Sequence, residues 1–196
     1  MLEVKRVYER TPFAREWLRS ARDQQARGDV FSAYFSAYVA LTVCCAQIRG
    51  DRNEKVTLDD HHDETLEKDA IEAAFKYKFR EISDFLDSDH GKRLTSAIWQ
   101  REILENKDAR IIGPGTSEEL KQAALRLSKF FSPSRFEPLS PSEQVEQAQE
   151  LTVVFRKVRN RLFHGGKMND PNGSDADLLG KLNPLLIEIV EILQKH

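Results

Sequence analysis

The chain has 196 residues, of which 40% are hydrophobic, so it is long enough to bury one sizeable core. Glycine and proline are scarce, and no segment is long and low in complexity, which excludes a repetitive chain and suits helices. The formal net charge of −2 hides two opposed regions: residues 51–72 hold nine acidic and three basic side chains, whereas residues 151–167 hold five basic side chains and no acid. A phosphate would be attracted to the second region.

The chain is predicted to begin with two helices joined by a tight turn. Thr11 and Pro12 form a helix start signal, and Gly28 followed by Asp29 ends the first helix and caps the second. The second helix includes residues 30–48, VFSAYFSAYVALTVCCAQI, which carry no charge and are about long enough to span a bilayer. Because several of these side chains are polar, we expect a helix buried in the core and no membrane span.

The two cysteines, Cys44 and Cys45, are adjacent in this apolar stretch. Neighbouring residues have a poor geometry for a disulfide, so the sequence predicts buried thiols in a reducing compartment. The first residues, MLEVKRVYERT, lack the apolar core of a secretory signal. We therefore expect a cytoplasmic protein.

Further helices are predicted in the middle of the chain. Apolar spacing indicates one helix over residues 64–86 and a shorter one over residues 93–104. Thr116 and Glu119 form a capping box for a helix through Phe131.

The strongest start signal is the capping box of Ser140 and Glu143, with Pro141 at the first helical position. That helix is predicted to end at Gly165 and Gly166. A last helix starts at Ser174 or Asp175, and its first half should be bent by Gly180 and Pro184. Its apolar residues form a seam suited to a second helix: Leu178, Leu182, Leu185, Ile189 and Ile192. No stretch alternates with period two, so the sequence predicts an all-α fold.

Residues 158–167, VRNRLFHGGK, carry the candidate functional side chains. Arg156, Asn160 and His164 are spaced by four, and we expect them on a face turned away from the apolar positions of the same helix. Arg159 and His164 are separated by about 140° and roughly 7 Å on a regular helix. To act on one phosphate, the pair needs either a frayed helix end or a second copy of the chain.

The segment RNRLFH, residues 159–164, resembles the Arg-x(4–6)-His motif of the HEPN (higher eukaryotes and prokaryotes nucleotide-binding) superfamily. The hairpin around Gly28 and Asp29, followed by VFSAYFSAYVAL, is also similar to the opening helices of that family. The resemblance implies a single HEPN-like helical bundle over residues 1–196, with residues 51–138 as a variable helical insertion. It further implies a homodimer in which two motifs share one cleft.

The resemblance implies a metal-independent endoribonuclease of the kind found as toxins and phage-defence effectors, in some cases held inactive by an antitoxin protein. Arg159 and His164 would be the catalytic pair and Asn160 the polar residue that orients them. The nearby Arg156, Arg161 and Lys167 are the expected RNA-binding side chains. RNA supplies its own nucleophile, the 2′-hydroxyl, so the reaction needs only an acid or base near neutral pH and a fixed cation. No metal or other cofactor is expected.

Two alternatives remain open at this point. Cations and glycines are ordinary at a helix C-terminus, so the motif could be only a helix end. The basic side chains around the motif could also belong to a non-catalytic module that binds RNA, a nucleotide or a partner protein. A metal site at His61 and His62 is disfavoured, because adjacent ligands lack the spacing of a helical site.

Overall fold

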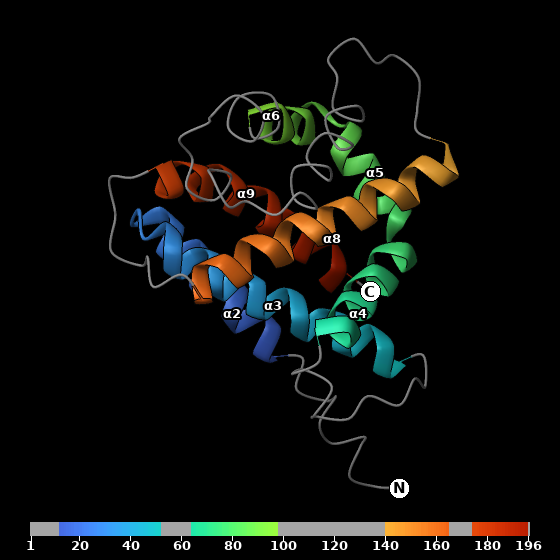
Figure 1. Ribbon diagram of the computed structural model, residues 1–196, viewed down its shortest axis with the longest axis horizontal. Coiled ribbons are helices and arrows are strands. Elements are labelled where there is room, and N and C mark those ends of the chain that lie inside the picture. Colours follow the sequence, from blue (N-terminus) through green and yellow to red (C-terminus); the bar gives the residue numbers. More distant parts are fainter. Residues whose placement is uncertain (1–11, 52–63, 98–139, 165–173, 196) are drawn as a thin grey trace, which may run out of the picture.

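The computed structural model describes residues 12–51, 64–97, 140–164 and 174–195, and the elements in these ranges are all α-helices (Figure 1). The predicted all-α fold is confirmed. The helices are α2 (Pro12–Ala26), α3 (Val30–Asp51), α4 (Glu64–Tyr77), α5 (Phe79–Asp87), α6 (Asp89–Ala97), α8 (Pro141–His164) and α9 (Ser174–Gln194). Helix α3 is central, because it packs against α2, α4, α8 and α9.

The turn between α2 and α3 forms as predicted. Gly28 has a positive φ of 79°, a conformation that glycine adopts without steric cost. The amide of Gly28 donates to the carbonyl of Gln25, and the amide of Asp29 donates to that of Gln24, so α2 ends in a Schellman motif. The Asp29 carboxylate then accepts from the amide of Ser32 at 3.1 Å and caps α3. The turn therefore holds α2 against α3 through short local bonds.

Helix α3 supplies much of the core. Its segment Val30–Ile48 is long and apolar enough to cross a membrane, and 56% of it is buried inside the fold. Tyr34 and Leu41 are among the largest fully buried side chains of the described residues. The expectation of buried thiols is confirmed, since Cys44 and Cys45 are free and almost fully covered. The segment is uncharged because α3 packs against α2, α4, α8 and α9, so most of its faces are covered by other helices.

A proline inside α9 is compensated by the hairpin turn. Pro184 has no amide hydrogen to donate to the carbonyl of Gly180 one turn earlier. The Gln25 side chain donates its Nε2 hydrogen to that carbonyl at 3.3 Å. In return, the Asn183 amide donates to Gln25 Oε1 at 2.8 Å and to the Val30 carbonyl at 2.9 Å. This network of buried polar groups joins α9 to the α2–α3 turn.

The helix predicted over residues 64–86 is two helices in the structure, α4 and α5. The break falls at Lys78, whose φ of −104° and ψ of 23° are not helical. The apolar stripe continues across the break, which is why the sequence pattern suggested one helix. The predicted helix over residues 93–104 begins earlier, since α6 starts at Asp89 after Ser88, whose hydroxyl accepts from the Gly91 amide at 3.1 Å.

The segment expected to be a variable insertion contributes to the main core. Ile71, Ala74 and Phe75 of α4 are fully buried, as are Ile82 and Leu86 of α5 to within a few per cent. These residues belong to the same apolar cluster as α3, α8 and α9. The described part of residues 51–138 is thus an integral part of the bundle. The helix predicted from Thr116 through Phe131 lies outside the described residues.

The apolar seam of α9 is used within the chain. Leu178, Leu182, Leu185 and Ile189 are at most 1% exposed, and α9 packs mainly against α3. The seam suits a second helix, as expected, and that helix belongs to the same chain. Little of the seam is left for a second copy of the chain.

Candidate functional site

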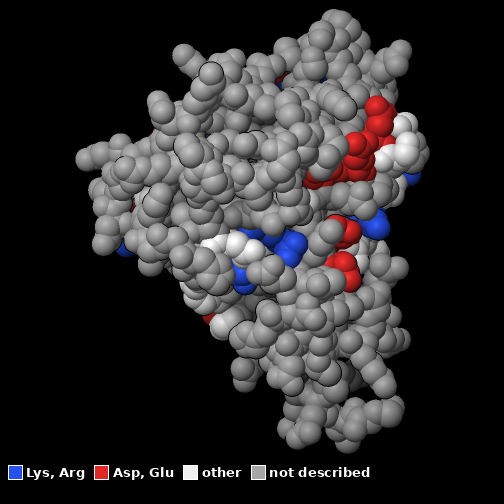
Figure 2. Space-filling model, in the orientation of Figure 1, with Lys and Arg blue, Asp and Glu red and all other residues white. Residues whose placement is uncertain are grey.

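Helix α8 carries the motif and has opposite charges at its two ends. Ser140 caps it as predicted: the Ser140 amide donates to Glu143 Oε2 at 2.8 Å, and the Glu143 amide donates to Ser140 Oγ at 3.4 Å. The first half holds Glu143, Glu146 and Glu150, whereas all charged residues after Leu151 are basic. Both ends are favourable for the helix dipole. Figure 2 shows acidic surface over the start of α8 and a small basic group farther along it.

Two motif side chains are in direct contact. Arg159 Nη1 donates to Asn160 Oδ1 at 2.6 Å, and both side chains are half-buried. The Arg159 guanidinium also lies over the ring of Tyr38 on α3, 5.6 Å from its centroid. The arginine is thus held by a hydrogen bond from the next residue and by an aromatic face from another helix. Its cation is fixed in direction before any ligand arrives.

Tyr38 belongs to a pair of tyrosines on α3 that packs against the motif region of α8. The rings of Tyr34 and Tyr38, one turn apart on α3, stack with centroids 6.3 Å apart. The Tyr34 hydroxyl donates to the carbonyl of Phe155 at 2.7 Å, in the turn of α8 that precedes Arg159. This stretch of α3 was expected in the core, but neither tyrosine was expected beside the motif. Two tyrosines spaced by four in an uncharged helix were the available signal, because buried hydroxyls need partners.

Arg156 differs from the sequence prediction. It was expected with Asn160 and His164 on a face turned away from the apolar positions, but only 9% of its surface is exposed. Thr152, one turn earlier on the same face, is completely buried. Helix α8 is therefore covered on more sides than its apolar stripe indicates. Little of the Arg156 side chain therefore lies at the surface, and its expected contact with RNA stays a prediction.

For the remaining motif residues the structure describes the backbone of α8 but not the side chains of Arg161 and His164. Helix α8 continues through His164, so Arg159 and His164 lie on one continuous helix. Five residues of regular helix separate their backbone positions by about 140° around the helix axis. The side chains of Arg161 and His164, and the whole of Lys167, lie outside the described positions. The described positions include no contact between the two predicted catalytic residues, Arg159 and His164, within one chain.

Within the described ranges, no three His, Cys, Asp or Glu side chains gather closely enough to hold a metal ion. His61 and His62 lie outside these ranges. The candidate site in the described part of the chain is therefore Arg159, its amide partner Asn160 and the supporting ring of Tyr38 at the basic end of α8. Such a group can bind a phosphate or stabilise charge that develops on one.

The HEPN resemblance consequently rests on the RNRLFH motif and the opening hairpin. No protein-family model matches the chain, and comparisons with curated proteins and with solved structures likewise found no match.

Proposed function

We propose that the protein is a metal-independent endoribonuclease that acts as a toxin or phage-defence effector. The observation that carries the proposal is the fixed Arg159, bonded to Asn160 and supported by Tyr38 beside the RNRLFH motif. A preorganised guanidinium can stabilise negative charge on phosphate oxygens without reorganisation during the reaction.

In the proposed reaction, the 2′-oxygen of one ribose attacks the neighbouring phosphorus, and the bond from phosphorus to the 5′-oxygen breaks. His164 serves as the acid or base, because an imidazole titrates near neutral pH. Arg159 stabilises the charge on the phosphate oxygens, and Asn160 orients Arg159. Arg161 and Lys167 hold the flanking backbone. The products are a 2′,3′-cyclic phosphate and a free 5′-hydroxyl.

The proposal includes a second copy of the chain. Helix α8 remains regular through His164, so a single copy directs Arg159 and His164 to different sides. Two motif helices related by a two-fold axis would place an arginine of one copy and a histidine of the other at one phosphate. The same divergence supports a second candidate, a module that binds RNA without cutting it. An antitoxin partner would regulate either one by covering the motif.

The test is incubation of purified protein with total RNA in EDTA. We expect cleavage to persist and to leave 2′,3′-cyclic phosphate ends, and we expect DNA to resist because it lacks the attacking hydroxyl. His164→Ala should lower the rate by roughly 10²-fold or more, the usual contribution of a positioned acid or base. Arg159→Lys should be severely impaired as well, since a point charge does not reproduce the planar fork.

Arg19→Lys is the matched control, because Arg19 is exposed on α2 and lies outside the motif. It should cleave at the wild-type rate. A strict requirement for magnesium or manganese would refute the mechanism, and equal cleavage by His164→Ala would refute the assignment. RNA binding with no cleavage in the wild type would favour the non-catalytic module. Circular dichroism of each variant establishes that its fold is retained.

A further inference from the structure

An uninterrupted row of aromatic side chains crosses the outer face of the α2–α3 hairpin. Phe13 and Trp17, one turn apart on α2, pack edge to face with ring centroids 6.1 Å apart. Trp17 packs in the same way on Phe35 of α3 at 5.9 Å. Phe13 is 50% exposed and Phe35 is 40% exposed, while Trp17 is half-buried between them. Large apolar side chains exposed together at this level are uncommon unless the surface binds something.

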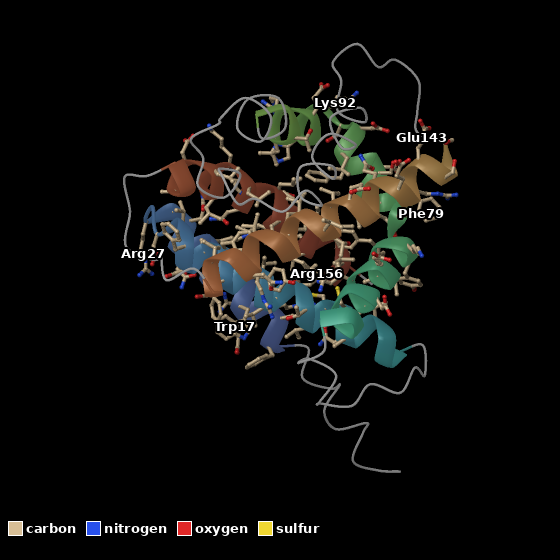
Figure 3. All side chains as sticks on the ribbon, in the orientation of Figure 1. Trp17, Arg27, Phe79, Lys92, Glu143 and Arg156 are labelled. Carbon is tan, nitrogen blue, oxygen red and sulfur yellow. The ribbon has the colours of Figure 1, made fainter. Side chains whose placement is uncertain are left out.

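The row leads to the motif. Phe35 and Tyr38 are three residues apart on α3 and therefore lie next to each other on its surface. Tyr38 in turn carries the Arg159 guanidinium over its ring. The order across the three helices is thus Arg159, Tyr38, Phe35, Trp17 and Phe13. Figure 3 labels Trp17 on α2 and Arg156, one turn before Arg159, on α8.

Cations lie at both ends of the row. At the α8 end, every charged residue of α8 after Leu151 is a cation. Helix α3 contributes no charge between Val30 and Ile48. At the α2 end, the exposed Arg15 and Arg19 lie on either side of Glu16 in the sequence. A polyanion is therefore attracted to both ends of the row.

We propose that this row, Phe13, Trp17 and Phe35, is a stacking platform for the unpaired bases of single-stranded RNA. The inference rests on the proposed function. A strand whose phosphate lies at Arg159 has neighbouring bases that must leave their own stack before the backbone can adopt a reactive geometry. Aromatic faces accept any base, because every base has a π-face, so the platform selects single strands over duplexes without selecting sequence.

The experiment uses the full chain with Trp99→Phe, which leaves Trp17 as the only tryptophan. The probe is a short 2′-O-methyl oligoribonucleotide, which cannot be cut because its 2′-oxygen is blocked. We expect the single strand to quench the fluorescence of Trp17 and the same sequence in duplex form to leave it nearly unchanged. Phe13→Ala and Phe35→Ala should each weaken binding roughly tenfold, within the range for the loss of one stacked base.

Two controls isolate the row. Phe35→Tyr keeps a ring and should bind like the parent. Tyr77→Ala removes a comparably exposed ring on α4, 57% exposed, that does not belong to the row, and it should also bind like the parent.

The inference is overturned if the alanine variants of the row bind as tightly as the parent, or if duplex quenches as well as single strand. It is also overturned if Phe35→Ala converts a dimer to a monomer without changing RNA affinity, because the rings would then contact a second copy. Cleavage of natural RNA that persists alongside any of these outcomes leaves the proposed function standing. A parent protein that neither binds nor cuts RNA removes both.

Discussion

Arg156 and Arg159 are three residues apart on α8 and have different surroundings. Arg156 is almost fully covered, whereas Arg159 is half-buried, bonded to Asn160 and placed over Tyr38. Their positions in the sequence do not distinguish them, because both lie beside an apolar stripe on the same helix. Coverage by other segments decides which arginine can meet a ligand. The RNA-binding role expected for Arg156 stays a prediction with little exposed surface behind it, and Arg159 keeps its place in the proposal.

Burial affects the chemistry of Cys44 as well. It raises the pKa of the Cys44 thiol from 9.0 to about 12, and a hydrogen bond with the Gln194 side chain offsets part of the rise. A thiolate at this position would lose its hydration among apolar neighbours of α2 and α9. The thiol is therefore expected to be unreactive in the folded protein.

The pH dependence of stability follows from that shift. Between pH 9.0 and about 12 the unfolded chain loses the Cys44 proton while the folded chain keeps it, so the free energy of unfolding falls as pH rises. The slope from this group is at most about 1.4 kcal/mol per pH unit. Urea unfolding at a series of pH values above 9 gives the free energy of unfolding of the Cys45→Ala protein with and without Cys44→Ala. Adding Cys44→Ala should make this free energy fall less steeply with pH. Identical slopes with and without the Cys44 change would contradict the expectation.

At the scale of elements, helix starts and stops were predictable because they depend on local bonds. The capping box at Ser140 and the glycine turn at Gly28 formed as the sequence indicated. The break at Lys78 was not predictable, since the apolar pattern passes through it. Helix α4 packs against α3 and α8, whereas α5 packs against α6, α8 and α9. The change of direction at Lys78 accommodates these different neighbours.

Two glycines should respond in opposite ways to alanine. A Cβ at Gly91 would lie 2.1 Å from the Phe85 carbonyl oxygen and 2.7 Å from Leu86 Cα, both backbone atoms that cannot turn aside. Gly91→Ala should destabilise the fold by roughly 1–3 kcal/mol, as overpacking does. At Gly180 the nearest atom is Val30 Cγ1 at 3.8 Å, an ordinary contact. Gly180→Ala should stabilise by about 0.5–1 kcal/mol, because alanine is the better residue inside a helix.

Urea unfolding of the two variants beside the wild type measures both effects. Equal stability of Gly91→Ala and the wild type would show that α6 does not approach α5 as closely as the structure has it. A loss of stability in Gly180→Ala would show that the contact with Val30 is tighter than ordinary packing.

At the scale of the whole molecule, the question is how two copies would meet. The apolar seam of α9 packs inside the chain, so pairing has to use a different surface. The proposed mechanism requires the motif ends of two α8 helices to lie near one axis. The surface that joins the copies is therefore expected near the C-terminal end of α8.

If the shared site is correct, the protein should sediment as a dimer at micromolar concentration, and its activity per chain should fall on dilution. Mixing the wild type with excess His164→Ala should change the activity per wild-type chain, because a mixed dimer holds only one complete motif. The measurements are sedimentation velocity and cleavage rate over the same concentration range. A fully active monomer would exclude the shared site and require Arg159 and His164 to converge within one chain.

The features that could be predicted from the sequence are those that depend on near neighbours along the chain. Helical periodicity gave the all-α fold, and caps, glycines and prolines gave most helix ends in the described ranges. The motif segment was found because its cations, amide and histidine are contiguous. These features are local, so their energies depend on residues within one or two turns.

Only the tertiary structure decided what each face of a helix touches. It buried Arg156, placed Tyr38 under Arg159, turned the α9 seam toward α3 and left Phe13 and Phe35 exposed beside Trp17. It also supplied Gln25 to the carbonyl that Pro184 leaves without a partner in α9. These contacts join residues as far as 155 positions apart, and a periodic pattern gives the direction of a face but not its partner. The partner depends on how all the helices fill one core at once.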